Sequence, residues 1–306
     1  MISNKIQSFI FVGTLGILFF LSGCTLVKKK NNTEYAFGAI ADCQYCASKG
    51  NGVRKFSLSN KKLLNCVTEF NKLNLEYVIH LGDFIDRDFK SFDILNPIYN
   101  KLHMPHYHVL GNHDFSVKDS LKKDVPKKMG LTSKYYDFRI KGWSYIVLDG
   151  NDVSFHAYPK KSIEWRQASE YYIKNKIKSP KYNGAIGETQ ISWLKNKLNQ
   201  AQQNNDKVIL YCHFPVYPPN SHNLWNAKEI IDLIEQFPCV KAYINGHNHK
   251  GNYSLKKGVH YLTLKGMVDT EKSSFAVIKV SDDSIDVTGY GREKNRTLLI
   301  KKPANK

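Results

Sequence analysis

Short apolar runs alternate with longer segments that carry apolar residues at helical spacing along most of this chain. The short runs are rich in β-branched and aromatic side chains and predict strands at residues 35–41, 77–81, 106–110, 143–148, 208–212, 240–244, 259–264, 275–280 and 284–287. The longer segments predict helices at residues 59–71, 92–102, 164–176, 189–202 and 227–236. Because the last third is rich in strands, we expect an α/β protein with two packed sheets flanked by helices rather than one parallel sheet.

One region departs from this alternation. Residues 155–187 are polar, irregular and rich in aromatic side chains, and we expect them to form an excursion over one edge of the core. The chain shows no internal repeat and no low-complexity stretch. Its 306 residues, less a leader, suit one large domain, which we place at residues 35–300.

The N-terminus has the features of an export signal. Lys5 precedes an apolar run at residues 9–21, which is too short for a membrane-spanning helix. The run ends in Leu-Ser-Gly-Cys, and this resembles the bacterial lipobox, in which the cysteine becomes lipidated and forms the new N-terminus. We therefore predict a signal peptide at residues 1–23, a lipid on Cys24 and a polar tether over residues 24–34. The predicted location is the bacterial cell envelope, outside the cytoplasm, and the alternative is a plain signal peptide or anchor helix.

The charge of the chain comes mostly from lysine. The formal net charge is +18, and only six of the 45 basic residues are arginine. Nucleic-acid sites usually concentrate arginine and aromatic side chains, so we expect no nucleic-acid partner. The lysines indicate a solvated surface, with attraction to anionic lipid or to phosphate-rich substrates as the alternative.

Five cysteines follow Cys24, and an odd number in an exported protein leaves at least one unpaired thiol. Cys43 and Cys46 have the spacing of a redox pair or of half a zinc site, but no second such pair exists. We interpret them as a local disulfide or as two buried thiols.

Five polar segments follow predicted strands directly. They are Ala41-Asp42-Cys43-Gln44, Gly82-Asp83-Phe84-Ile85-Asp86-Arg87, Gly111-Asn112-His113-Asp114, Cys212-His213-Phe214-Pro215 and Gly246-His247-Asn248-His249. The carboxyl ends of strands form the ligand crevice of α/β sheets. Two of the segments carry polar residues at i and i+2, which in an extended chain point to the same side. The pattern therefore predicts one centre built from Asp, Asn, Gln and His side chains.

This series resembles the calcineurin-like metallophosphoesterase superfamily. Within it the chain is similar to manganese-dependent ADP-ribose/CDP-alcohol diphosphatases, on the strength of Asp42-Cys43-Gln44-Tyr45, His213-Phe214-Pro215-Val216-Tyr217-Pro218, Trp225-Asn226, Gly251-Asn252-Tyr253 and Gly289-Tyr290-Gly291-Arg292. The resemblance runs from about residue 35 to residue 296 and implies a four-layer αββα sandwich of two mixed β-sheets flanked by helices. It also implies hydrolysis of phosphoanhydride or phosphodiester bonds, with a nucleoside-diphosphate-linked substrate such as ADP-ribose or a CDP-alcohol. The alternative is a general extracytoplasmic phosphodiesterase or phosphomonoesterase that scavenges phosphate.

The resemblance assigns roles to individual residues. One divalent metal ion would be held by Asp42, Gln44, Asp83 and His249, and a second by Asp83, Asn112, His213 and His247. His113 would act as general acid or transition-state stabiliser, oriented by Asp86. Manganese is the expected ion, with iron or zinc as alternatives, because an amide oxygen at Gln44 favours a harder ion than imidazole does.

The charges of the ligand set fit this chemistry. Only Asp42 and Asp83 among the ligands are anionic, so two divalent cations would leave the centre positive and suited to a diphosphate. Arg87 is a candidate phosphate contact beside these ligands. Residues 45–56 and 155–187 are the segments expected to border a nucleotide pocket. We interpret a further histidine group, His103, His106 and His108, as structural or surface residues, since no carboxylate accompanies it.

Overall fold

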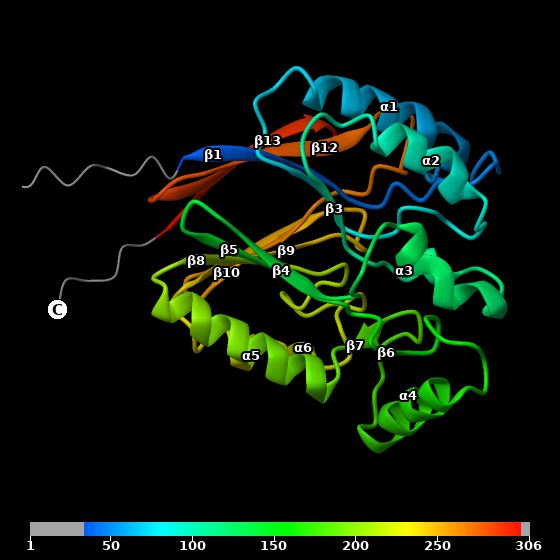
Figure 1. The fold of residues 1–306 in the computed structure, drawn as a ribbon. Coiled ribbons are helices and arrows are strands. Elements are labelled where there is room, and N and C mark those ends of the chain that lie inside the picture. The colour runs from blue at the N-terminus through cyan, green and yellow to red at the C-terminus, as the bar shows by residue number, and fades with distance from the viewer. Residues whose placement is uncertain (1–33, 301–306) are drawn as a thin grey trace, which may run out of the picture. The chain divides into compact units, whose positions relative to one another are not determined.

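Two six-stranded β-sheets lie face to face in the computed structural model, which describes residues 34–300 (Figure 1). The first sheet has the order β14-β13-β12-β1-β2-β3. Its strands are β1 (Tyr35–Ile40), β2 (Val78–His80), β3 (His106–His108), β12 (Ser274–Val280), β13 (Ser284–Gly291) and β14 (Arg296–Leu299). Strands β1, β2 and β3 are parallel to one another. The neighbouring pairs β1 and β12, β12 and β13, and β13 and β14 are each antiparallel.

The second sheet has the order β10-β11-β9-β8-β5-β4. Its strands are β4 (Tyr136–Ile140), β5 (Trp143–Val147), β8 (Lys207–Tyr211), β9 (Val240–Asn245), β10 (Asn252–Lys256) and β11 (Val259–Thr263). The four inner strands are parallel, and β4 and β10 close the edges antiparallel. Both sheets are therefore mixed.

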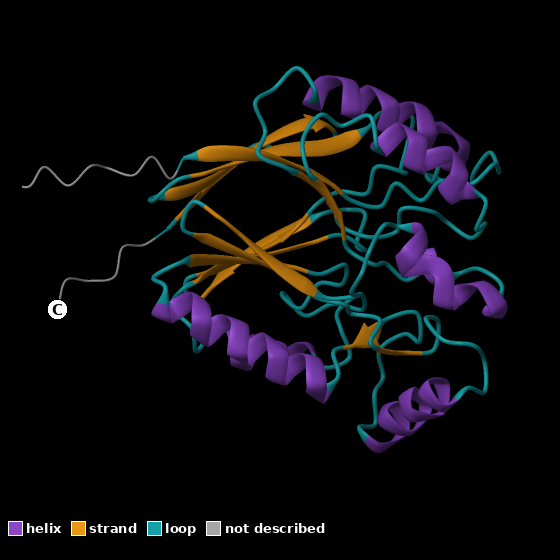
Figure 2. Cartoon of the chain, in the orientation of Figure 1, coloured by secondary structure: helices purple, strands orange, loops and turns teal. Residues whose placement is uncertain are grey.

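Helices cover the outer face of each sheet (Figure 2). On the first sheet lie α1 (Ser59–Phe70) and α2 (Ser91–Tyr99), and on the second lie α5 (Glu188–Gln203) and α6 (Ala227–Ile234). The buried face of α1 presents Leu63, Val67 and Phe70 to the sheet, at the helical spacing seen in the sequence. The expected αββα sandwich is confirmed.

Aromatic side chains fill the space between the sheets. Phe37 and Tyr77 of the first sheet stack with ring centroids 4.7 Å apart, and Tyr145 and Tyr211 of the second sheet pack against Phe37 edge-on. The hydroxyl oxygens of Tyr77 and Tyr211 lie 2.7 Å apart, so these buried polar groups pair with each other across the two sheets. This contact fixes one sheet against the other.

Three edge strands were not predicted: β4, β10 and β14. In β4 and β10 partly buried residues alternate with exposed ones, so neither strand forms an apolar run in the sequence. Residues 155–187 form the expected excursion, which contains α4 (Ile163–Lys174) and β7 (Gly184–Ala185). Strand β7 pairs antiparallel with β6 (Val153–Ser154) in a two-stranded sheet. A short helix, α3 (Val125–Lys128), precedes β4.

Among the described residues, neither the Cys43 and Cys46 pair nor the group of His103, His106 and His108 belongs to the metal-ligating cluster. All five cysteines of residues 34–300 are free thiols, and Cys43 and Cys46 are buried, so the thiol alternative holds for that pair. His108 is buried under Phe84, and the His106 ring lies 3.1 Å from the Asn100 side-chain oxygen. Within the described residues, no helix combines the length and apolar character needed to cross a bilayer. The predicted signal peptide, Cys24 and nearly all of the tether lie outside the described residues.

Candidate metal centre

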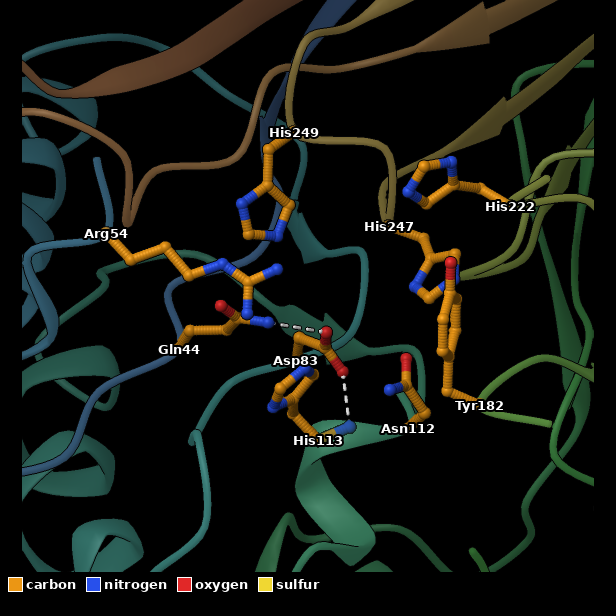
Figure 3. Close-up of a pocket in the computed structure, with 9 residues that line it drawn as sticks. All are labelled: Gln44, Arg54, Asp83, Asn112, His113, Tyr182, His222, His247 and His249. Atoms are coloured by element: carbon orange, nitrogen blue, oxygen red, sulfur yellow. Dashed lines mark hydrogen bonds between the residues drawn. The ribbon is translucent and has the colours of Figure 1, made fainter. Parts of the chain in front are cut away.

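The five polar segments predicted from the sequence meet at one edge of the sandwich. They follow β1, β2 and β3 of the first sheet and β8 and β9 of the second. Between them lies a cavity of about 290 Å³ (Figure 3). Its walls are formed by Gln44, Arg54, Asp83, Asn112, His113, Tyr182, His222, His247 and His249.

Four of the seven predicted metal ligands have a left-handed backbone. The φ angles are +52° at Asp42, +44° at Gln44, +55° at Asp83 and +66° at His247. Aspartate and histidine adopt this region more readily than most side chains do, but glutamine does not. Such strain persists only where the surrounding structure enforces it, and its concentration in the ligand loops indicates a functional site.

The loop that carries Asp83 is held by Asp114, for which no role was predicted. The buried Asp114 carboxylate accepts hydrogen bonds from the backbone N–H groups of Asp83, Phe84, Ile85 and Gly111, at 2.8–3.1 Å. A Cβ atom at Gly111 would lie 2.1 Å from the Asp83 nitrogen, so only glycine fits there. Burial and the adjacent Asp83 raise the pKa of Asp114 to about 7.

Four ligand atoms meet on the side of the cavity formed by Asp83, Asn112, His213 and His247. The Nε2 atom of His213 lies 3.1 Å from His247 Nδ1, 3.2 Å from the Asn112 side-chain oxygen and 3.3 Å from an Asp83 carboxylate oxygen. The other ring nitrogens are engaged elsewhere. His213 Nδ1 donates to the Leu81 carbonyl at 2.8 Å, and His247 Nε2 donates to the Asn183 side-chain oxygen at 2.9 Å. Each imidazole therefore points its remaining nitrogen at the same point, as ligands of one cation do.

Asp42, Gln44 and His249 form the neighbouring side. His249 Nε2 lies 3.4 Å from an Asp42 carboxylate oxygen, while His249 Nδ1 donates to Asp269 at 2.9 Å. The Gln44 amide nitrogen donates to Asp83 at 2.9 Å, and the Gln44 oxygen is buried with no hydrogen-bond partner in residues 34–300. A buried oxygen without a donor is costly, and a metal ion would satisfy it. The seven predicted ligands thus fit two cations that share Asp83.

The acid–base state of the imidazoles is set by burial and by the nearby carboxylates. Burial disfavours the charged ring, but Asp83 raises the pKa of His213 to about 9. Burial likewise disfavours a charged His249 ring, but Asp42 favours it and raises the pKa of His249 to about 9. Burial and the His213 ring lower the pKa of His247 well below its ordinary value. At neutral pH a metal ion must therefore displace protons from two of the three rings.

His113 lies at the cavity beside these ligands. Its backbone N–H donates to Asp83 at 2.8 Å, and its Nδ1 lies 3.0 Å from the buried Asp86 carboxylate (Figure 3 shows the first contact). Burial lowers the pKa of His113, but Asp83 and Asp86 raise it further than burial lowers it. The Asp86 backbone carbonyl accepts a hydrogen bond from Nδ1 at 3.2 Å, so Nε2 is the ring nitrogen left to donate a proton.

Two arginines lie near the centre, and one of them lines the cavity. The predicted phosphate contact, Arg87, pairs with Asp86, lies over the Phe56 ring and is not among the residues that line the cavity. Arg54 lines it instead, on the side of Gln44 and His249 (Figure 3). Proximity to the Gly82–Arg87 motif favoured Arg87 in the sequence, whereas a turn of the chain brings Arg54 to the cavity.

Sequence reasoning missed four further residues of the centre: Tyr182, Asn183, His222 and Asp269. Tyr182 and Asn183 belong to the excursion at residues 155–187, and Arg54 belongs to residues 45–56, the two segments expected to border the pocket. That expectation was the available signal for them. His222 and Asp269 follow no strand directly, and nothing in their sequence pattern marks them.

Comparisons with known proteins show which family and fold this chain matches. A family model described as calcineurin-like phosphoesterase matches residues 37–251. The manganese-dependent ADP-ribose/CDP-alcohol diphosphatase of Arabidopsis thaliana is 30% identical over 298 residues, which cover 84% of this chain and 94% of that protein. The Xenopus laevis protein of the same name is 26% identical over 336 residues, covering 91% of this chain and 94% of that protein. A crystal structure of a dimetal phosphatase from Danio rerio superimposes with a TM-score of 0.78 at 22% identity, covering 87% and 99% of the two chains.

Proposed function

Because this chain belongs to the calcineurin-like phosphoesterase family, and is thus a metal-dependent phosphoester hydrolase, we propose that it cleaves nucleoside-diphosphate-linked compounds such as ADP-ribose or CDP-alcohols. The proposed cofactors are two divalent ions, manganese first among them. The observation that carries the proposal is the convergence of seven oxygen and nitrogen ligands, with a glutamine among them, around one cavity that five of them line directly.

The choice of substrate is supported by the relatives. Those of Arabidopsis thaliana and Xenopus laevis are named as manganese-dependent ADP-ribose/CDP-alcohol diphosphatases, and the similarity extends over most of both chains. The choice of manganese is supported by the ligand set as well. An amide oxygen, carboxylates and imidazoles without thiolate suit manganese better than they suit a softer ion.

The protein's own residues supply positioning and a proton. Two divalent ions, when bound, would draw charge from the phosphate oxygens and lower the pKa of a water molecule. Asp86 holds His113 so that Nε2 faces the cavity, where it donates a proton to the leaving oxygen. General acids of this kind contribute roughly 10²–10⁴-fold to the rate. Arg54 lines the cavity as the cation available to a second phosphate group.

The test uses residues 25–306, stripped of metal and reloaded with Mn²⁺, Mg²⁺ or Zn²⁺. Hydrolysis of ADP-ribose, CDP-choline and bis(p-nitrophenyl) phosphate is followed for the wild type, for His113→Ala and for the exposed control His103→Ala. We expect AMP and CMP release that requires Mn²⁺, collapses in His113→Ala and persists in the control. Cleavage of the synthetic diester alone would contradict the diphosphatase function and favour a scavenging phosphodiesterase.

We also propose that the chain is a lipoprotein of the bacterial envelope, anchored through Cys24. The support is the Leu-Ser-Gly-Cys sequence after a short apolar run. Expression of the full chain in a bacterium, with labelled palmitate in the medium, should label the wild type and leave Cys24→Ala unlabelled and released from membranes. Equal labelling of both proteins, or a wild type that stays in the cytoplasm, would contradict the proposal.

A further inference from the structure

A lysine of α1 points its ammonium into the protein, behind the Asp42 side of the centre. Lys62 is only 5% exposed, and its Nζ donates to the carbonyl oxygens of Met267 at 2.8 Å and Thr270 at 2.6 Å. The carbonyl oxygens of Val268 and Asp269 lie 3.2 and 3.4 Å away. An ammonium has three N–H donors, so the two shortest contacts, at the two ends of residues 267–270, are the ones it makes best.

A charge in this position is expensive. Burial and the neighbouring Arg292 lower the pKa of Lys62 to about 8, which reports the cost of keeping the ammonium there. Nearby residues on the same buried face of α1, Leu63 and Cys66, are apolar or weakly polar and pack without a charge. A buried lysine among such residues indicates that its ammonium N–H groups are needed as hydrogen-bond donors to residues 267–270.

Residues 267–270 touch three groups of the centre. The N–H groups of Met267 and Val268 donate to the carbonyl oxygens of Ala41 and Asp42, at 2.8 and 2.9 Å. The Asp269 carboxylate accepts from His249 Nδ1 at 2.9 Å and so selects the tautomer that leaves Nε2 for the ion. The backbone of Asp269 also pairs with that of Arg54.

The backbone of residues 267–270 is strained at the residue that makes the shortest hydrogen bond to Lys62. Thr270 has φ +55°, a conformation that is an outlier for a β-branched residue. Its N–H donates to Val53 at 2.6 Å and its carbonyl accepts from Lys62 at the same distance. These two short hydrogen bonds thus hold Thr270 in a backbone conformation that threonine rarely adopts.

We propose that Lys62 is a positioning residue for the metal centre: its ammonium fixes residues 267–270, so that Asp269 keeps His249 oriented and Arg54 stays at the cavity. The inference depends on the two-ion centre and is independent of which phosphoester is the substrate. Lys62 touches neither ion nor substrate, and its effect on the ions passes through Asp269.

Manganese binding to the metal-free protein provides the test. Calorimetric titration of Lys62→Met is compared with Lys61→Met, which removes an exposed lysine from the same helix. We expect one of the two ions to bind about 10–100-fold more weakly in Lys62→Met, the range for groups that orient a metal-ligating histidine. Electron paramagnetic resonance should then show isolated Mn²⁺ where wild type and Lys61→Met show a coupled pair. Normal binding of both ions by a folded Lys62→Met would overturn the proposal.

Asp269→Asn and the double variant examine the route of the effect. If Lys62 acts through Asp269, the double variant loses no more affinity than the weaker-binding single variant does, whereas additive losses would overturn that route. Should Lys62→Met fail to fold, Lys62→Gln retains an amide donor and is expected to lose less of the same ion's affinity; unchanged binding in Lys62→Gln and Asp269→Asn would likewise overturn the proposal. Intact manganese binding with no cleavage of ADP-ribose would instead refute the proposed substrate and leave this inference standing.

Discussion

The two proposed ion positions share Asp83 but support their histidines differently. At the Asn112 side, His213 and His247 donate to a backbone carbonyl and to an amide oxygen, which are neutral acceptors. At the Asp42 side, His249 donates to the carboxylate of Asp269. A carboxylate acceptor makes an imidazole more basic and a stronger ligand, but it also requires its own positioning. One position therefore orients its histidines with neutral hydrogen-bond acceptors, whereas the other orients its histidine with a charged one.

Removing the shared carboxylate should erase the difference between the positions. Asp83 lies within hydrogen-bond reach of Gln44, His113 and His213, so Asp83→Asn takes a charged ligand from both ions at once. An orienting group contributes about 10–100-fold to metal affinity. We expect both manganese affinities to fall by more than this, and we expect turnover to be lost. Calorimetric titration of the metal-free variant measures this, and retention of one full-affinity ion would show that Asp83 is not shared.

Lowering the pH should weaken both positions in the same way. His213 and His249, one at each position, have pKa values raised to about 9 in the metal-free protein. Below that pH each ring holds a proton that an ion must displace, so affinity falls as pH drops, by about tenfold per pH unit for each ion. Titrations in buffers of different ionisation enthalpy should report about one proton released per ion at pH 7. A pH-independent affinity at either position would contradict the carboxylate origin of these shifts.

Truncating a neutral acceptor should affect one position alone. Asn183→Ala leaves His247 Nε2 without its partner, and the ion at the Asn112 side should bind about 10-fold more weakly. The exposed Asn175, in the same excursion, provides the matched control as Asn175→Ala. An equal loss at both positions would mean that Asn183 supports the loop as a whole rather than His247.

The smallest effect is expected from the layer between the sheets. Tyr77→Phe removes the hydrogen bond to Tyr211 and leaves a buried hydroxyl without its partner, at a cost of about 1–2 kcal/mol in the free energy of unfolding. Since neither tyrosine lines the cavity, any change in manganese affinity should be small and equal for the two ions. Urea denaturation with and without Mn²⁺ measures both quantities, and a selective loss at one position would contradict this interpretation.

The ligand residues could be predicted from the sequence because they follow apolar strands directly. Parallel strands such as β1 and β2 bring their carboxyl ends together, so a polar residue after each strand is placed by the topology itself. Asn183 and Asp269 could not be predicted in this way. Both reach the histidines through long irregular segments, where no periodic pattern links sequence position to position in space. Arg54 was overlooked for the same reason, and the edge strand β4 because its alternating pattern is weak in a short segment.

The left-handed backbone at the ligands has a consequence for protein engineering. Gln44 and His247 occupy φ values of +44° and +66°, where glycine or asparagine would relieve strain. Sequence redesign that optimises stability alone would therefore replace these residues first and remove the metal centre while leaving the fold intact. Thermostable variants of this enzyme should be sought with these loop positions held constant, because at them stability and catalysis favour different amino acids.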